Sequence, residues 1–188
     1  IFANVLRDTL GGSHSNTDLL LPCTDLDKLF PDAAARFIEA RGGKISLSAR
    51  IDSIGRQDLA FTIDGETFDH VVLATAPQHA PSLLERHPET AAIAELIKSY
   101  RYEPIGTVYL GYPEEFRLPF PMLGMDDGKT DRLGQWVFDR GQLGGANGVM
   151  GCVLSAAGAW DERDNAELAA ALHAELQEAL GRNLPQPL

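Results

Sequence analysis

The sequence predicts an α+β fold or an interrupted α/β fold, and two observations carry this prediction. Polar and apolar residues alternate in segments between residues 44 and 76 and again between residues 105 and 155, which predicts two groups of strands. Apolar residues at helical spacing occupy separate segments before, between and after these groups. Strands and helices that come in runs, rather than in strict alternation, are typical of α+β proteins.

The first two elements are expected to be helices. Residues 1–6 have a helical pattern, and Gly11-Gly12 ends this first helix. Residues 31–43 form the second helix, because Pro31 suits a first turn and Gly42-Gly43 supplies a C-terminal stop.

A strand meander is expected to follow the second helix. Its strands lie at residues 44–54, 59–63 and 68–76. Asp64-Gly65 is a strong signal for a two-residue hairpin turn, because glycine accepts a positive φ. The continuous apolar run at residues 71–74 predicts a strand that is covered on both faces.

The second half of the chain contains helices, then strands, then a last helix. Residues 78–100 form two helical pieces that separate near His87-Pro88. Three strands are expected next, at residues 105–112, 134–139 and 148–155. The last helix spans residues 164–180, where Asp164 and Glu167 make a capping box.

The composition argues against several classes of function. The 188 residues include 16 Lys and Arg against 27 Asp and Glu, which gives a formal net charge of −11. We therefore expect no nucleic-acid partner and no polybasic membrane anchor, since both need dense positive charge. No apolar run approaches the roughly 20 residues that a transmembrane helix requires.

No metal site is expected either. The five histidines are scattered, and no pair has the i, i+4 spacing of a helical metal site. Cys23 and Cys152 lie outside any CxxC motif, so we expect two free thiols. Trp136 and Phe138 alternate along a predicted strand and therefore share one face. They line an apolar pocket or belong to a plain core, and the pattern alone leaves both interpretations open.

Several segments, taken in chain order, resemble one enzyme family. They are Leu19-Leu20-Leu21-Pro22, Val71-Val72-Leu73-Ala74-Thr75-Ala76-Pro77, Thr107-Val108-Tyr109-Leu110 and Gly134-Gln135-Trp136-Val137-Phe138-Asp139-Arg140-Gly141. Together they resemble the squalene-associated FAD-dependent desaturases, also called hydroxysqualene dehydroxylases. These enzymes belong to the superfamily of flavin amine oxidases and phytoene desaturases. The last segment is specific for the subgroup, whereas the VVLATAP pattern is common to the superfamily.

The resemblance implies an oxidoreductase that uses reduced FAD to convert hydroxysqualene to squalene in hopanoid biosynthesis. It implies a cytoplasmic enzyme that takes an apolar isoprenoid substrate and contacts the inner membrane peripherally. The superfamily carries a GxGxxG flavin fingerprint that is not in this sequence, so we expect an internal fragment. By resemblance, residues 1–28 are a substrate-domain segment and crossover, and residues 29–77 belong to the FAD-domain meander. Residues 78–188 form a substrate-binding domain, in which helices back a mixed sheet.

The resemblance also implies two sets of site residues. The backbone of two segments would approach FAD, and the matching residues are Ile51, Ala74, Thr75, Ala76 and Pro77. Apolar side chains would line the substrate pocket, and the matching residues are Tyr109, Met122, Trp136 and Phe138. The sequence nominates no catalytic residue.

Three alternatives stay open at this point. The chain could be part of a carotenoid or phytoene desaturase, part of a flavin amine oxidase, or a binding module without enzymatic activity. The fragment interpretation predicts that the isolated chain binds FAD poorly or not at all, because the glycine turn that holds the pyrophosphate is missing, and that it is inactive. It also predicts exposed apolar surface and self-association. A binding module would instead be a clean monomer that ignores FAD.

Overall fold

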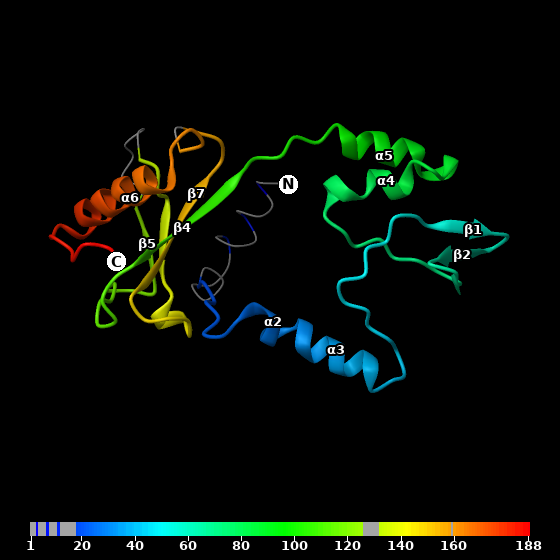
Figure 1. Cartoon of the computed structure of the whole chain (residues 1–188), viewed down its shortest axis with the longest axis horizontal. Coiled ribbons are helices and arrows are strands. Elements are labelled where there is room, and N and C mark those ends of the chain that lie inside the picture. Colours follow the sequence, from blue (N-terminus) through cyan, green and yellow to red (C-terminus); the bar gives the residue numbers. More distant parts are fainter. Residues whose placement is uncertain (1–2, 4–6, 8–10, 12–17, 126–131, 159) are drawn as a thin grey trace. The chain divides into compact units, whose positions relative to one another are not determined.

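The computed structural model describes Ala3, Arg7, Gly11 and residues 18–125, 132–158 and 160–188. It contains helices and two sheets, so the predicted α+β fold is confirmed. The chain divides into two compact units (Figure 1). We call Ile1–Ala40 with Glu103–Leu188 the sheet unit, and Arg41–Tyr102 the meander unit. No helix in the described residues is long and apolar enough to cross a membrane.

The meander unit contains a three-stranded antiparallel sheet. Its strands are β1 (Gly55–Gln57), β2 (Ala60–Ile63) and β3 (Glu66–Phe68), in that order. The predicted hairpin turn is confirmed between β2 and β3, where Asp64 has φ 51° and Gly65 has φ 84°. Positive φ at both central residues is the type I′ geometry, which matches the right-handed twist of the flanking strands.

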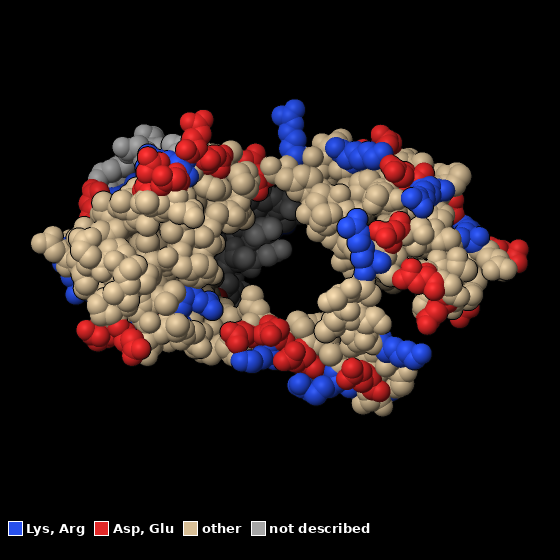
Figure 2. Space-filling model, viewed as in Figure 1, with Lys and Arg blue, Asp and Glu red and all other residues tan. Residues whose placement is uncertain are grey.

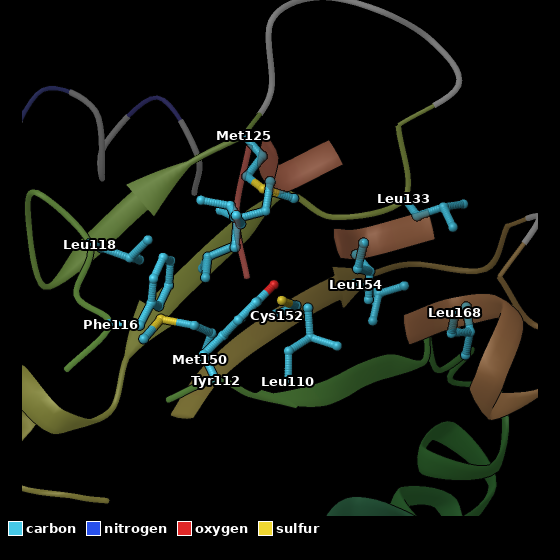
Figure 3. Close-up of a cluster of buried hydrophobic side chains, with 14 residues drawn as sticks. Leu110, Tyr112, Phe116, Leu118, Met125, Leu133, Met150, Cys152, Leu154 and Leu168 are labelled. Atoms are coloured by element: carbon cyan, nitrogen blue, oxygen red, sulfur yellow. The ribbon is translucent and has the colours of Figure 1, made fainter. Parts of the chain in front are cut away.

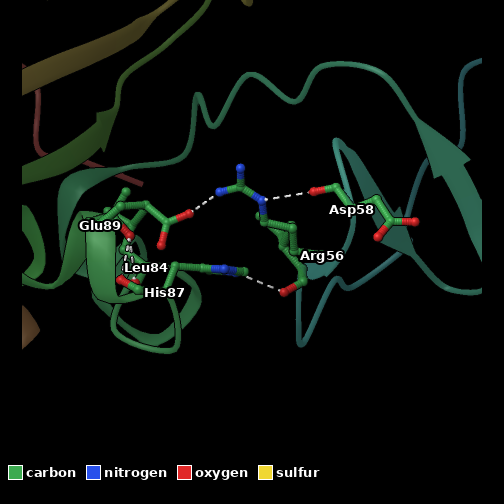
Figure 4. Close-up of polar contacts among 7 residues, drawn as sticks. Arg56, Asp58, Leu84, His87 and Glu89 are labelled. Carbon is green, nitrogen blue, oxygen red and sulfur yellow. Dashed lines mark hydrogen bonds and ion pairs between the residues drawn. The ribbon is translucent and has the colours of Figure 1, made fainter.

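The helical part of the meander unit packs beside its sheet. It contains α4 (Pro81–Leu84) and α5 (Ala91–Lys98), with short 3-10 helices at Pro77–His79 and Pro88–Thr90, so the predicted break near His87-Pro88 is confirmed. Two side chains tie this part to the strands (Figure 4). The Arg56 guanidinium pairs with Glu89, and His87 Nε2 lies 2.9 Å from the backbone oxygen of Ile54.

Two predicted strands of the meander are wrong. Residues 44–54 and 69–76 do not pair with any strand in the described part of the chain. A strand needs a neighbour for its backbone hydrogen bonds, and sequence periodicity cannot supply one. Ser48 has φ 55°, which also breaks the extended conformation. The apolar run at 71–74 is correspondingly uncovered, and the side chain of Val72 is 89% exposed.

The sheet unit is built on four strands in the order β4-β7-β6-β5. They are β4 (Ile105–Gly111), β5 (Met122–Gly124), β6 (Trp136–Asp139) and β7 (Val149–Ser155). All three pairings are antiparallel, so the predicted mixed sheet is wrong in this detail. The links from β5 to β6 (residues 125–135) and from β6 to β7 (residues 140–148) are shorter than the dozen or more residues that a parallel crossover needs. The strand β5 was not predicted, because three residues carry too little periodicity.

One helix, α6 (Asn165–Leu180), covers the inner face of this sheet. The predicted capping box is confirmed, since the Asp164 carboxylate accepts from the Glu167 N–H and Glu167 accepts from the Asp164 N–H. Leu172 and Leu176 are fully buried against the sheet. Figure 3 shows the resulting core, in which Leu110, Tyr112, Met150, Cys152 and Leu154 come from β4, the residue after it and β7.

The sheet unit also contains α2 (Leu26–Leu29) and α3 (Pro31–Glu39). The predicted helix at 31–43 is confirmed and ends earlier, and Gly42 follows with φ 81°. The predicted opening helix at 1–6 lies almost entirely outside the described residues.

In Figure 2, positive and negative side chains are interspersed over the visible surface of the described residues.

Candidate functional site

The outer face of the four-stranded sheet, opposite α6, carries the first candidate site. Side chains alternate between the two faces of a strand, so Val137 and Asp139 of β6 point to the core and are fully buried. Trp136 and Phe138 therefore point to the outer face, where Trp136 is 43% exposed and Phe138 is half-buried. The sequence left open whether these aromatics belong to a core, and the structure places them outside it.

The strand register aligns the residues of this face in rows. Tyr109 of β4 lies opposite Gly151 of β7, Gly151 lies opposite Phe138 of β6, and Phe138 lies opposite Met122 of β5. Trp136 lies one row away on the same face, opposite Val153 and Gly124. All four residues predicted for the substrate wall thus lie on one face, which we call the apolar sheet face. Tyr109 is 64% exposed there, and Met122 is half-buried.

The chemistry of the apolar sheet face is uniform. None of the outward-facing residues within the four described strands carries a charge. Aromatic, thioether and aliphatic side chains dominate, and the polar groups are the hydroxyls of Tyr109, Thr107 and Ser155 with the indole N–H of Trp136. Strands lie about 4.8 Å apart, so the row from Tyr109 to Met122 spans roughly 14 Å. The chemistry of such a surface suits contact with apolar groups through burial and offers no charge for an ion pair.

A buried carboxylate holds the loops beside this face. Asp139 ends β6 and is fully buried, and its Oδ2 accepts from the Leu118 N–H at 3.0 Å and from Gln142 Nε2 at 2.8 Å. Its Oδ1 accepts from the Gln142 N–H at 3.3 Å. Sequence reasoning missed this role. The available signal was a charged residue at an inward position of an otherwise apolar strand.

The second candidate site is a cavity of about 920 Å³ in the meander unit. Three of the five residues predicted to contact the cofactor, Ile51, Ala74 and Thr75, line it together. The other two, Ala76 and Pro77, are not among its lining residues. The walls come from the two extended segments 49–54 and 71–75, from Ile63 of β2, and from residues 78–86 around α4.

The residues of this cavity fit one end of a flavin nucleotide. Its volume lies within the roughly 300–1,000 Å³ of known ligand pockets. The two extended segments have no partner strand in the described chain, so backbone groups are available to an adenine or a ribose. Arg50 and Arg86 supply positive charge, although Arg50 Nε pairs with Asp52 at 2.8 Å.

The acidic side chain Glu85 also lines this cavity, and its negative charge is balanced by an ion pair with Lys98. Lys98 Nζ lies 2.7 Å from its carboxylate, and this hydrogen bond and charge lower the pKa of Glu85 below its usual value. The same carboxylate, together with Glu95, raises the pKa of Lys98. The pair therefore stays ionised at neutral pH and adds no net charge to the wall. A diphosphate would need further positive charge or a glycine turn, and the sequence contains no GxGxxG.

Comparisons with known proteins bear on both sites. The family model for flavin containing amine oxidoreductases matches residues 25–188. The chain is also similar to the crystal structure of a proposed protoporphyrinogen oxidase from Exiguobacterium sp. 255-15, with a TM-score of 0.55 and 16% sequence identity. That match covers 77% of this chain and 33% of the other, so the chain spans about one third of that structure's length. At such low identity the likeness concerns the fold alone. No curated protein matches the sequence.

Proposed function

The chain belongs to the family of flavin containing amine oxidoreductases, and we propose that it is part of an FAD-dependent oxidoreductase whose substrate is a squalene-type isoprenoid. The observation that carries this proposal is the apolar sheet face, where Tyr109, Phe138, Met122 and Trp136 lie together and no outward-facing residue of the four strands is charged. Within this substrate class we propose reductive dehydroxylation of hydroxysqualene to squalene, which the sequence segments around residues 134–141 favour.

The length and polarity of the face favour a long hydrocarbon over a small amine. A row of roughly 14 Å exceeds what a small amine can cover. An amine also carries a positive charge, and the outward residues of these strands offer no carboxylate to pair with it. Burying a hydrocarbon on such a surface contributes about 25 cal/mol for each Å² of apolar area. A carotenoid-type substrate shares this chemistry and is the nearest alternative.

The proposed cofactor site is separate from the apolar sheet face. We propose that the cavity in the meander unit receives the adenine end of FAD, against the backbone of Ile51, Ala74 and Thr75. FAD, when bound in its reduced form, supplies the reducing equivalents for loss of the hydroxyl. The assignment of residues 29–77 to the FAD domain and of residues 78–188 to the substrate domain belongs to the same proposal. So does peripheral contact with the inner membrane, from which a lipid substrate would be drawn.

Product analysis tests this function. The enzyme that carries this chain is incubated with hydroxysqualene and reduced FAD and, in separate reactions, with phytoene or benzylamine and oxidised FAD, because desaturation and amine oxidation need an electron acceptor. We expect squalene from hydroxysqualene and no conversion of the other two compounds. Desaturated phytoene would establish the carotenoid alternative, and oxidised benzylamine would establish an amine oxidase.

A second experiment separates the enzyme from a binding module without activity. The chain is titrated with FAD and followed by flavin fluorescence, and its molar mass is measured by light scattering. We expect weak or no binding of FAD, because no GxGxxG turn is present to hold the pyrophosphate. We also expect self-association through exposed apolar residues such as Val72 and Ile105. A clean monomer would favour the binding module.

A further inference from the structure

The apolar sheet face contains two glycines that aromatic rings approach closely. A Cβ atom on Gly151 would lie 3.4 Å from Cε1 of Tyr109, its neighbour in the row. A Cβ atom on Gly124 would lie 3.2 Å from Cζ3 of Trp136, its partner on β6. Each ring therefore leans over the glycine of the adjacent strand instead of standing clear of it.

Backbone conformation does not explain these two glycines. Neither Gly151 nor Gly124 has a positive φ, so other residues could adopt the same backbone. A glycine inside a strand weakens it, since it has no side chain to pack and loses more conformational entropy than other residues. Close approach of another group is one reason for a strand glycine, and here the groups that approach are two aromatic rings.

We propose that Gly151 and Gly124 are positioning residues that let Tyr109 and Trp136 lay their rings along the sheet, so that the face binds an extended unsaturated chain. This inference rests on the proposed function and deepens it, because it names the residues that shape the ligand surface. Side chains on a sheet stand roughly perpendicular to it when their neighbours are occupied. A ring that leans over a glycine presents its broad π-face to a ligand, and that face contacts a polyene over a larger area than an edge would.

A methyl group at either glycine should displace the ring. At Gly124 the 3.2 Å contact is tighter than nine in ten real Cβ contacts, so the ring of Trp136 must give by a few tenths of an ångström. At Gly151 the 3.4 Å contact lies at the limit of that range, so the ring of Tyr109 must give less. The rings are exposed on their outer side, so they can tilt away and the fold is retained. The substitution then changes the ligand surface without opening a hole in the core.

The test uses the full chain and the fluorescent polyene parinaric acid, with squalene and benzylamine as competitors. Binding is followed by quenching of tryptophan emission. Gly151→Ala and Gly124→Ala are compared with Gly158→Ala, a control outside the four strands whose Cβ would meet only Trp160 Cδ1, at an ordinary contact distance of 3.7 Å. We expect about tenfold weaker binding for the first two variants, and a change within about twofold for the control.

Double variants show whether the glycines act through the rings. In a Tyr109→Ala background Gly151→Ala should have no further effect, and in a Trp136→Phe background Gly124→Ala should have none. Gly124→Ala alone should also shift the emission spectrum of Trp136, while thermal unfolding midpoints stay close to that of the unsubstituted chain. Equal weakening with and without the rings, or unchanged affinity in both alanine variants, would overturn the proposal.

The same titration distinguishes a failure of the glycine inference from a failure of the proposed function. If the unsubstituted chain binds parinaric acid and squalene displaces it, the apolar sheet face has the ligand class that we propose, and the glycine variants decide the rest. If the unsubstituted chain does not bind parinaric acid, or if benzylamine displaces it and squalene does not, the proposed function itself is overturned.

Discussion

Replacement of Asp139 by alanine should destabilise the sheet unit strongly. The Asp139 carboxylate is fully buried and accepts two short hydrogen bonds, from the Leu118 N–H at 3.0 Å and from Gln142 Nε2 at 2.8 Å. Hydrogen bonds to a charged group contribute about 1.5–3 kcal/mol each, so their loss costs about 3–6 kcal/mol. Removal of a buried charge recovers part of this, because its desolvation no longer opposes folding. We therefore expect a loss of about 3 kcal/mol in the free energy of unfolding.

The asparagine variant refines this expectation. Asp139→Asn keeps the shape and one acceptor oxygen, so with that oxygen toward Leu118 it loses only the longer bond from the Gln142 N–H, at 3.3 Å. Its loss should be about 1 kcal/mol. Glu115→Ala, at an exposed carboxylate of the sheet unit, is the control and should stay within about 0.5 kcal/mol.

Urea denaturation followed by tryptophan fluorescence measures these changes. Both tryptophans, Trp136 and Trp160, belong to the sheet unit, so their emission reports the unfolding of that unit. A shift of the midpoint at unchanged slope gives the difference in free energy. An alanine variant within 1 kcal/mol of the unsubstituted chain would refute the idea that this carboxylate organises the loops beside the apolar sheet face.

Three further predictions concern the core, the hairpin turn and the thiols. Leu172→Ala removes a fully buried side chain and should lower the free energy of unfolding by about 2–5 kcal/mol, measured by the same urea titration. Gly65→Ala puts a side chain at φ 84° and should speed amide exchange in β2 and β3, at a cost of about 1 kcal/mol. A thiol reagent at pH 8 should label the exposed Cys23 and spare the buried Cys152 until the chain is unfolded. Burial raises the pKa of Cys152 from 9.0 to about 12. The thiol therefore loses its proton at a lower pH in the unfolded chain than in the folded chain, and the free energy of unfolding should fall as pH rises above about 9.

Local signals in the sequence predicted local structure well. The capping box at Asp164 and the hairpin turn at Asp64-Gly65 depend on residues close together in the chain, and both are confirmed. The strands β4, β6 and β7 were also found, and along β4 and β6 more exposed residues alternate with more buried ones. Such signals need no knowledge of distant partners.

Features that depend on distant partners could not be predicted in this way. The segments at 44–54 and 69–76 have strand-like sequences, but no strand of the described chain pairs with them. The row from Tyr109 to Met122 requires the register of four strands, which periodicity does not contain. The resemblance placed these side chains on a pocket wall without this geometry. The hydrogen bond from the Leu118 N–H to Asp139 joins residues 21 positions apart and left no pattern in the sequence.

Photo-crosslinking tests the central claim, that the apolar sheet face binds a squalene-type chain, most directly. A squalene analogue that carries a diazirine is bound to the chain and activated, and the labelled peptides are identified by mass spectrometry. We predict that labels fall on the peptides of β4, β5 and β6 that contain Tyr109, Met122 and Phe138, and that excess squalene suppresses them. Labels confined to the exposed apolar residues of α5, such as Ile93 and Leu96, would contradict the claim.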